Sequence, residues 1–484
     1  MVSPSSSHQH PQECEMTRNQ RGLVETCFEE GQYESGIAVL EQLRSENFKP
    51  PVSLIRQLFY IALYPPPSSL GYVEERDLNP ASPSKSSPTK QKHQAPKMTF
   101  APSVNASEAA QRLLLSFVRT NTPTSLFQAL PQPRRNNELT FEGDDHDSIV
   151  AKESLCIKDA KHCWAILKEG FVPRIKIPPP SLLAGKKKRG KLITDTEEYE
   201  ADRSNSVLAP VAEHAWLVLR WLVELFQRDE YLTSGDASAK HSPLLLLQIP
   251  PPRSGTGLRW EADAPLDIVF YCVSQDQPQR RQLGLELMTL LIGICLTAEF
   301  DFNMFLEQVT SRLYSASPEI IQTFMSGFHL SQSAQLFKLA LCRKFLSDES
   351  SGKNPSNRRP KPTARAVRAA RGIAAKEENL SSSSANDSSA SFSASKISMP
   401  PASDVVHLLT GSGRTSSPAI LTVKKELLIS YAYLQQIAER RDAEWQQLVT
   451  DGRLGDRVVS VFGESYAQQD KDALISLVRV WAMN

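Results

Sequence analysis

The sequence predicts an all-α protein: an irregular stack of helices, similar to armadillo or HEAT repeats, that long disordered inserts interrupt. Apolar residues recur at helical spacing in nearly every segment that is not rich in serine or proline. No Asn-Gly hairpin signal and no sustained alternation of apolar and polar residues indicates strands. The 33 prolines exceed the 21 glycines and gather in clusters, which favours interruptions between helices. No period repeats along the chain, so the stack is expected to be irregular.

The first predicted helical unit covers residues 17–64 and follows a disordered tail, residues 1–16. Apolar stripes begin at Leu23, Ile37 and Leu54, and the last of them stops at Pro65-Pro66-Pro67. Proline lacks a backbone donor and clashes within a helix, so such clusters act as boundaries. We therefore expect three short helices joined by tight turns.

Helical segments and inserts alternate along the rest of the chain. Ser317 and Pro318 have the sequence of a helix start, because serine caps helices and proline suits the first turn. For residues 244–249, a short apolar run, a strand remains an alternative to a helix. The expected divisions are a disordered linker (65–106), a helical segment with an acidic loop (107–177), a basic and acidic disordered loop (178–206), the main helical core (207–346), a basic and Ser-rich disordered insert (347–417) and a C-terminal helical unit (418–484).

Charge and cysteine usage narrow the class of protein. The chain has 55 Lys and Arg against 54 Asp and Glu, so its net charge of +1 excludes a global polycation. The longest apolar run, residues 287–296, is about half of the roughly 20 residues that span a bilayer. The N-terminal residues lack the features of a secretory signal. Seven cysteines, an odd number, indicate free thiols in the cytosol or nucleus.

The sequence contains no recognisable catalytic or metal-binding motif. The run from Gly185 to Leu192 approaches a phosphate-binding loop, but Leu192 lacks the hydroxyl that such a loop offers to magnesium. Cys156, His162 and Cys163 have no second ligand pair at zinc-finger spacing. We therefore expect a protein that is not an enzyme and that uses no catalytic residue, cofactor or metal.

Two basic runs are candidate interaction sites. The first is a nuclear-localisation candidate, with a solvated charge run as the alternative: Lys186, Lys187, Lys188, Arg189 and Lys191. The second, residues 352–376, has a local charge of +8, and cations there would release counterions from a nucleic acid. Its alternatives are a second import signal and an inert linker. The DNA-contact candidates are Arg358, Arg359, Lys361, Arg365, Arg368 and Arg371.

Two apolar features are candidate protein contacts. Val405, Val406 and Leu408 follow an acidic residue, a pattern typical of SUMO-interacting motifs, which add a strand to a partner's sheet. A nascent turn of helix is the alternative. Trp216 and Trp221 lie on a predicted helix that is apolar almost all round. Tryptophan is common among binding hot spots, so both are partner-binding candidates, with burial in the core as the alternative.

Several stretches together resemble a known family. The strongest is Leu23-Val24-Glu25, Glu30-Gly31, Ile37-Ala38-Val39-Leu40, Leu43 and Pro50-Pro51-Val52. Others are His214 to Leu219, residues 264–307 and residues 320–346, which include Phe324-Met325-Ser326-Gly327-Phe328 and Phe337-Lys338. In their order along the chain and in the residue types they contain, these stretches resemble the helical domain of the localisation factor of the structural-maintenance-of-chromosomes five/six complex. They are also similar to its SUMO-interacting-motif-containing relative. No BRCT or ankyrin pattern accompanies them.

This resemblance implies a nuclear scaffold in DNA repair. Its expected partners are a companion localisation factor and subunits of the chromosome-maintenance complex, with SUMO and non-specific DNA as further candidates. The scaffold would help to recruit the complex to sites of DNA damage. The alternative hypothesis, which the helical pattern alone supports equally, is an adaptor in cytosolic transport or cytoskeletal assembly.

Overall fold

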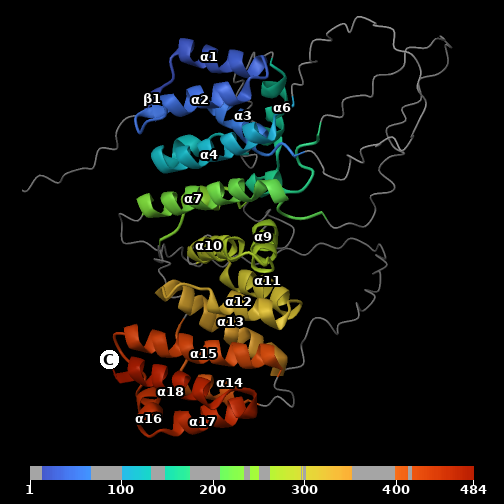
Figure 1. Ribbon diagram of the computed structural model, residues 1–484. Helices are drawn as coiled ribbons and strands as arrows, with labels where there is room; N and C mark the ends of the chain where they lie inside the picture. Colours follow the sequence, from blue (N-terminus) through green and yellow to red (C-terminus); the bar gives the residue numbers. More distant parts are fainter. Residues whose placement is uncertain are drawn as a thin grey trace, which may run out of the picture. The chain divides into compact units, whose positions relative to one another are not determined.

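The computed structural model describes residues 13–66, 101–131, 148–174, 208–233, 240–249, 262–295, 297, 301–350, 398–411 and 417–483. Within these ranges the secondary structure is almost entirely helical, which confirms the all-α class (Figure 1). None of the described helices is both long and apolar enough to cross a lipid bilayer. The chain divides into two compact units, and the main boundary lies between Gly284 and Leu285.

Unit 1 begins with three short helices, as the apolar stripes and the proline cluster predict. They are α1 (Arg18–Glu29), α2 (Tyr33–Leu43) and α3 (Val52–Ala62). Thr17 caps α1 in a reciprocal pair with Gln20. Two short strands, β1 (Cys14–Glu15) and β2 (Phe48–Lys49), pair in parallel beside them. The expected disordered tail 1–16 is therefore wrong at its end, because the Cys14 amide donates to the Asn47 carbonyl over 2.6 Å.

The remaining helices of unit 1 pack onto this start. Helix α4 follows Ser103, whose Oγ accepts from the Ala106 amide, so the helix starts before the predicted boundary at residue 107. Residues 243–247 form a helix, so the strand alternative there is wrong; Ser242 caps it and donates to the Asp229 carboxylate over 2.6 Å. The elements are α4 (Val104–Thr120), α5 (Pro123–Phe127), α6 (Ile149–Asp159), η2 (Cys163–Leu167), η4 (Glu213–Ala215), α7 (Trp216–Thr233), α8 (Pro243–Leu247) and α9 (Asp263–Val273).

Unit 2 is built around α13 (Gln332–Ser350) and α15 (Pro418–Ile437), which pack extensively on each other. As predicted, Ser317 caps α12 (Pro318–Ser326) and Pro318 occupies its first turn. The other elements are α11 (Phe302–Tyr314), α14 (Ala402–Thr410), α16 (Ala443–Thr450), α17 (Arg453–Phe462), η6 (Gly463–Ser465) and α18 (Gln468–Met483). Helix α10 (Pro278–Cys295) runs from one unit into the other.

Two further predicted divisions differ from the structure. The expected main core, 207–346, is split between the two units, because the boundary falls inside α10. The expected disordered insert, 347–417, contains the end of α13 and the whole of α14. Helix α14 is held in place by apolar burial: Ala402 and Val405 are completely covered. A short apolar run beside a serine tract was enough to form a helix here because α15 lies against it.

Candidate functional site

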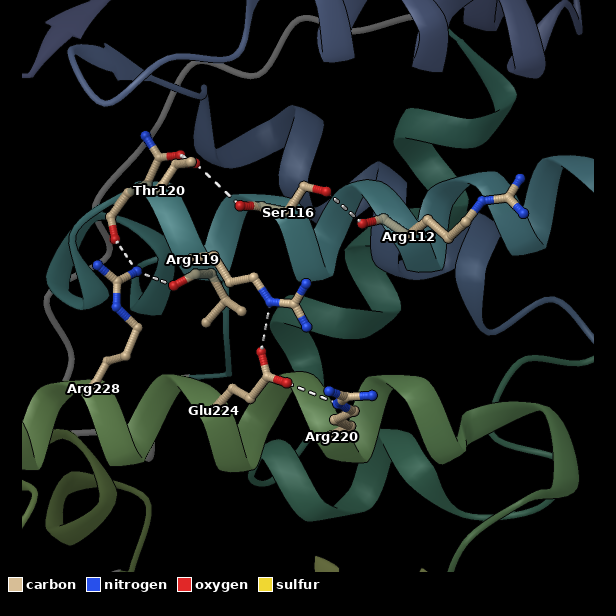
Figure 2. Close-up of polar contacts among 9 residues, drawn as sticks. Arg112, Ser116, Arg119, Thr120, Arg220, Glu224 and Arg228 are labelled. Atoms are coloured by element: carbon tan, nitrogen blue, oxygen red, sulfur yellow. Dashed lines mark hydrogen bonds and ion pairs between the residues drawn. The ribbon is translucent and has the colours of Figure 1, made fainter. Parts of the chain in front are cut away.

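Helices α4 and α7 of unit 1 lie side by side and run in the same direction (Figure 2). Midway along α4, the Gln111 side-chain amide donates over 2.9 Å to the carbonyl of His214, which lies just before α7. At the C-terminal end of α4, Nη1 of Arg228 donates to the Asn121 carbonyl over 2.8 Å. Residue numbers thus rise together along both helices, so the two helices pack in parallel.

We call the following residues on these two helices the arginine strip: Arg112, Ser116, Arg119, Arg220 and Glu224, which Figure 2 labels, together with Leu217 on α7. On α4 the members are spaced by four and three residues, and on α7 by three and four, so each set shares one helix face. The side chains of Arg119 and Arg220 are 58% and 47% exposed. The strip is therefore a solvent-facing surface rather than part of the core.

Glu224 joins the two helices within the strip. Its Oε1 lies 2.7 Å from Nε of Arg220, one turn earlier on α7, and its Oε2 lies 3.4 Å from Nε of Arg119 on α4. Both arginines make this contact through Nε, so the two terminal nitrogens of each guanidinium are not used in it. One carboxylate thus orients two guanidinium groups, which is favourable for bidentate recognition of an anion.

Arg228 has a different role at the end of the strip. Its Nη1 donates to the carbonyls of Val118 and Asn121, which lie at the C-terminal end of α4. The last carbonyls of a helix lack partners within it, and a cation there also complements the helix dipole. Burial lowers the pKa of Arg228 from its ordinary value, and the carboxylate of Glu13 opposes that shift. Arg228 is therefore a capping residue that holds α4 against α7.

A cleft of about 230 Å³ lies between α3 and α6 in the same unit. Its lining residues are Ser53, Arg56, Gln57, Ala151, Lys152, Ser154 and Leu155. Arg56 is buried, and its Nη2 donates to the Gln128 carbonyl over 3.3 Å. These lining residues include no carboxylate, thiol or imidazole.

Four of the described cysteines have thiols whose reactivity burial reduces. Burial raises the pKa of Cys272 to about 12 and that of Cys156 to about 11. The fully buried thiols of Cys163 and Cys342 shift in the same direction for the same reason. Since the thiolate is the nucleophile, these four cysteines are poorly reactive near neutral pH. Within the described ranges, no three His, Cys, Asp or Glu side chains gather as a metal site would require.

The tryptophans predicted as partner contacts are core residues instead. Trp221 is completely buried and meets Phe59 edge-on, with ring centroids 4.8 Å apart. Trp216 stacks on Tyr271, with centroids 6.0 Å apart, and carries the Arg280 guanidinium 4.4 Å above its ring. Neighbouring elements cover this apolar helix on most sides, so its large side chains are buried. Trp216 and Trp221 therefore fit the alternative of burial in the core.

The SUMO-interacting candidates lie in a helix. Val405 and Val406 are buried in α14, and Leu408 is half-buried on the same helix. Strand addition requires an extended and accessible segment, so this placement does not fit such a motif. The structure instead agrees with the alternative, a helix. The nuclear-localisation candidate at 186–191 and the DNA-contact candidates at 358–371 lie outside the described residues, and both remain predictions.

Sequence reasoning missed the arginine strip as a surface. Arg112 and Arg119 are seven residues apart in a predicted helix, and Arg220 precedes Glu224 by four, so each half has a helical signature. Nothing local indicates that the two helices pack in parallel.

Comparisons of the chain with family models, with curated proteins and with solved structures find no match.

Proposed function

We propose that the chain is a non-enzymatic nuclear scaffold that binds a helical partner and helps to recruit the structural-maintenance-of-chromosomes five/six complex to DNA damage. The observation that supports it most is the arginine strip. It is an exposed, charged surface on two packed helices, and an ion-paired carboxylate orients two of its three arginines. Such a surface suits recognition of another macromolecule. The cleft between α3 and α6, by contrast, is lined by no carboxylate, thiol or imidazole.

The choice of partner rests on the sequence resemblance described above. Its strongest segment, residues 23–52, covers most of α1, all of α2 and the start of α3, and a second segment, residues 320–346, covers much of α12 and α13. Both segments fold as helices that place apolar residues such as Leu40 and Phe324 in the core, although Leu23 and Leu330 are exposed. The proposed partners are therefore a companion localisation factor and subunits of the chromosome-maintenance complex.

Affinity purification of the full chain from nuclear extract, followed by mass spectrometry, tests this function. We expect the companion factor and complex subunits to be recovered, and their recovery to increase after DNA damage. Recovery of cytosolic transport or cytoskeletal proteins alone would contradict the proposal and favour the adaptor alternative. Turnover of a metabolite by the purified chain would contradict the non-enzymatic assignment.

A further inference from the structure

We propose that the arginine strip docks an acidic amphipathic helix from a partner protein, a step that rests on the scaffold function proposed above. In this arrangement Arg112 and Arg119 face acidic residues that lie two turns apart on the partner. Arg220 and Leu217, on α7, contact the side of the same helix. The inference concerns the chemistry of the partner segment, which the scaffold proposal leaves open.

Charge complementarity selects an acidic occupant. The strip has three guanidinium groups and one carboxylate, and Glu108, exposed one turn before Arg112, adds a second carboxylate to this face. Basic groups therefore outnumber acidic groups there by three to two. Arg112 forms no ion pair with any residue in the described ranges, and Arg119 and Arg220 keep their terminal nitrogens outside the contact with Glu224. Complementary potentials of this kind determine which partner binds and how quickly it associates.

The spacing of the arginines matches a helix. Arg112 and Arg119 are seven residues apart on α4, which corresponds to about 10.5 Å along the helix axis. Acidic residues at positions i and i+7 of a partner helix are separated by the same distance, so both ion pairs can form together. Leu217, 37% exposed on α7, offers an apolar contact beside them. Amphipathic helices bind through their apolar face, so Leu217 would receive an apolar residue of the partner helix while the arginines pair with its acidic residues.

The same surface is less suited to nucleic acid. Glu224 lies at the centre of the strip, and Glu108 lies exposed one turn before Arg112 on α4. These carboxylates would repel the phosphates of a nucleic acid. A partner helix, in contrast, can place a basic residue opposite Glu108. The strip also contains no aromatic side chain on which a base could stack. The mixed charge therefore favours a protein segment.

Fluorescence anisotropy with the full chain tests the proposal. The probe is a labelled, alanine-rich helical peptide of about 20 residues with glutamates at i, i+4 and i+7 and one leucine on the same face. A second peptide of identical composition has its glutamates distributed around the helix, and a labelled duplex DNA of about 20 base pairs is the third probe. We expect the first peptide to bind at least about tenfold more tightly than the second.

Charge reversal provides the decisive comparison. The double substitution Arg112→Glu with Arg119→Glu is expected to weaken binding of the acidic peptide by about tenfold or more. The same variant should instead bind a peptide with lysines in place of the glutamates, a gain that loss of folding cannot produce. Arg18→Glu, an exposed position at the start of α1, is the control and should leave binding within about twofold.

The outcomes separate the two proposals. Equal binding of the two glutamate peptides, or full binding by the charge-reversed variant, would overturn the docking site. Binding of duplex DNA that the double substitution abolishes, without peptide binding, would assign the strip to nucleic acid. If complex subunits co-purify equally with wild type and variant, the scaffold function stands and the strip assignment fails. If the peptide binds but no complex subunit co-purifies, the strip stands and the recruitment function fails.

Discussion

Lys338 of α13 and Glu426 of α15 form an ion pair inside unit 2. Nζ of Lys338 lies 2.7 Å from Oε2 of Glu426, and the two side chains are 4% and 8% exposed. Nζ also donates to the Met325 carbonyl over 3.3 Å, which ties α12 to the pair. Three helices thus meet at one buried ammonium group, so the pair fixes how these helices pack.

Removing one partner of this pair should destabilise unit 2 strongly. Glu426→Ala leaves the Lys338 charge buried without its carboxylate, and such a change typically costs about 3–5 kcal/mol. The joint replacement of Lys338 by Met and Glu426 by Leu removes both charges, so its effect should be much smaller. Urea denaturation, which gives the free energy of unfolding, measures both effects.

An exposed pair in the same unit provides the control. Arg453 and Asp451 lie 3.3 Å apart, with side chains 64% and 38% exposed. Because solvent screens such pairs, Asp451→Ala should change the free energy of unfolding by less than about 1 kcal/mol. Equal losses for Glu426→Ala and Asp451→Ala would show that burial does not control the energy of the Lys338–Glu426 pair.

Helix starts were the part of the fold that the sequence predicted best. Ser317 and Pro318 carry a local signal, because a cap and a first-turn proline act within one turn. The boundary between Gly284 and Leu285 carries none, since helical periodicity continues through α10 without a break. The pairing of Cys14 with Phe48 was also missed, because two-residue strands are too short to show alternation.

The candidate site was harder to predict than the fold. The ion pair between Arg119 and Glu224 joins segments that are far apart in sequence, and only packing of α4 on α7 brings them together. Trp221 illustrates the opposite case. Tryptophan is common at binding sites, which suggested that Trp221 is a binding residue. Its burial depends on neighbours such as Phe59, and the apolar pattern of its own helix does not reveal these neighbours.

Truncation of Trp221 should therefore affect stability rather than binding. Trp221→Ala opens a cavity in the core of unit 1 and should cost about 3–5 kcal/mol of unfolding free energy. Trp221→Phe keeps a ring against Phe59 and removes an Nε1 that donates to no acceptor in the described ranges, so its cost should be far smaller. Thermal denaturation compares the two variants. Loss of partner recovery with Trp221→Phe at unchanged stability would instead support the partner-binding hypothesis.

Nuclear import provides a prediction for the basic run at 186–191. Replacing Lys186, Lys187, Lys188, Arg189 and Lys191 with neutral residues removes the charge that an import receptor would bind. We expect a fluorescent fusion of this variant to shift from nucleus to cytoplasm. A matched control replaces basic residues between 353 and 376, which tests the alternative import signal. Unchanged nuclear retention of the first variant would contradict the assignment.

Acidification should destabilise unit 1 through His214. Burial lowers the pKa of His214 below its ordinary value of 6.5, although a hydrogen bond to the Leu63 backbone and the carboxylates of Glu169 and Glu213 oppose the shift. The folded state therefore favours the neutral imidazole. Its contribution to stability is complete above about pH 6.5, the ordinary pKa of the unfolded chain, and is lost as the pH falls through the lower pKa of the folded state.

The variant His214→Gln tests this contribution, because glutamine keeps a hydrogen-bonding group and does not titrate. The free energy of unfolding, measured by urea denaturation between about pH 7.5 and pH 5, should fall less steeply for this variant than for wild type. His407→Gln, at an exposed position on α14, is the matched control for the chemical change from histidine to glutamine. If His214→Gln kept the wild-type slope, His214 would bind protons equally in both states, and its burial would have no consequence for stability.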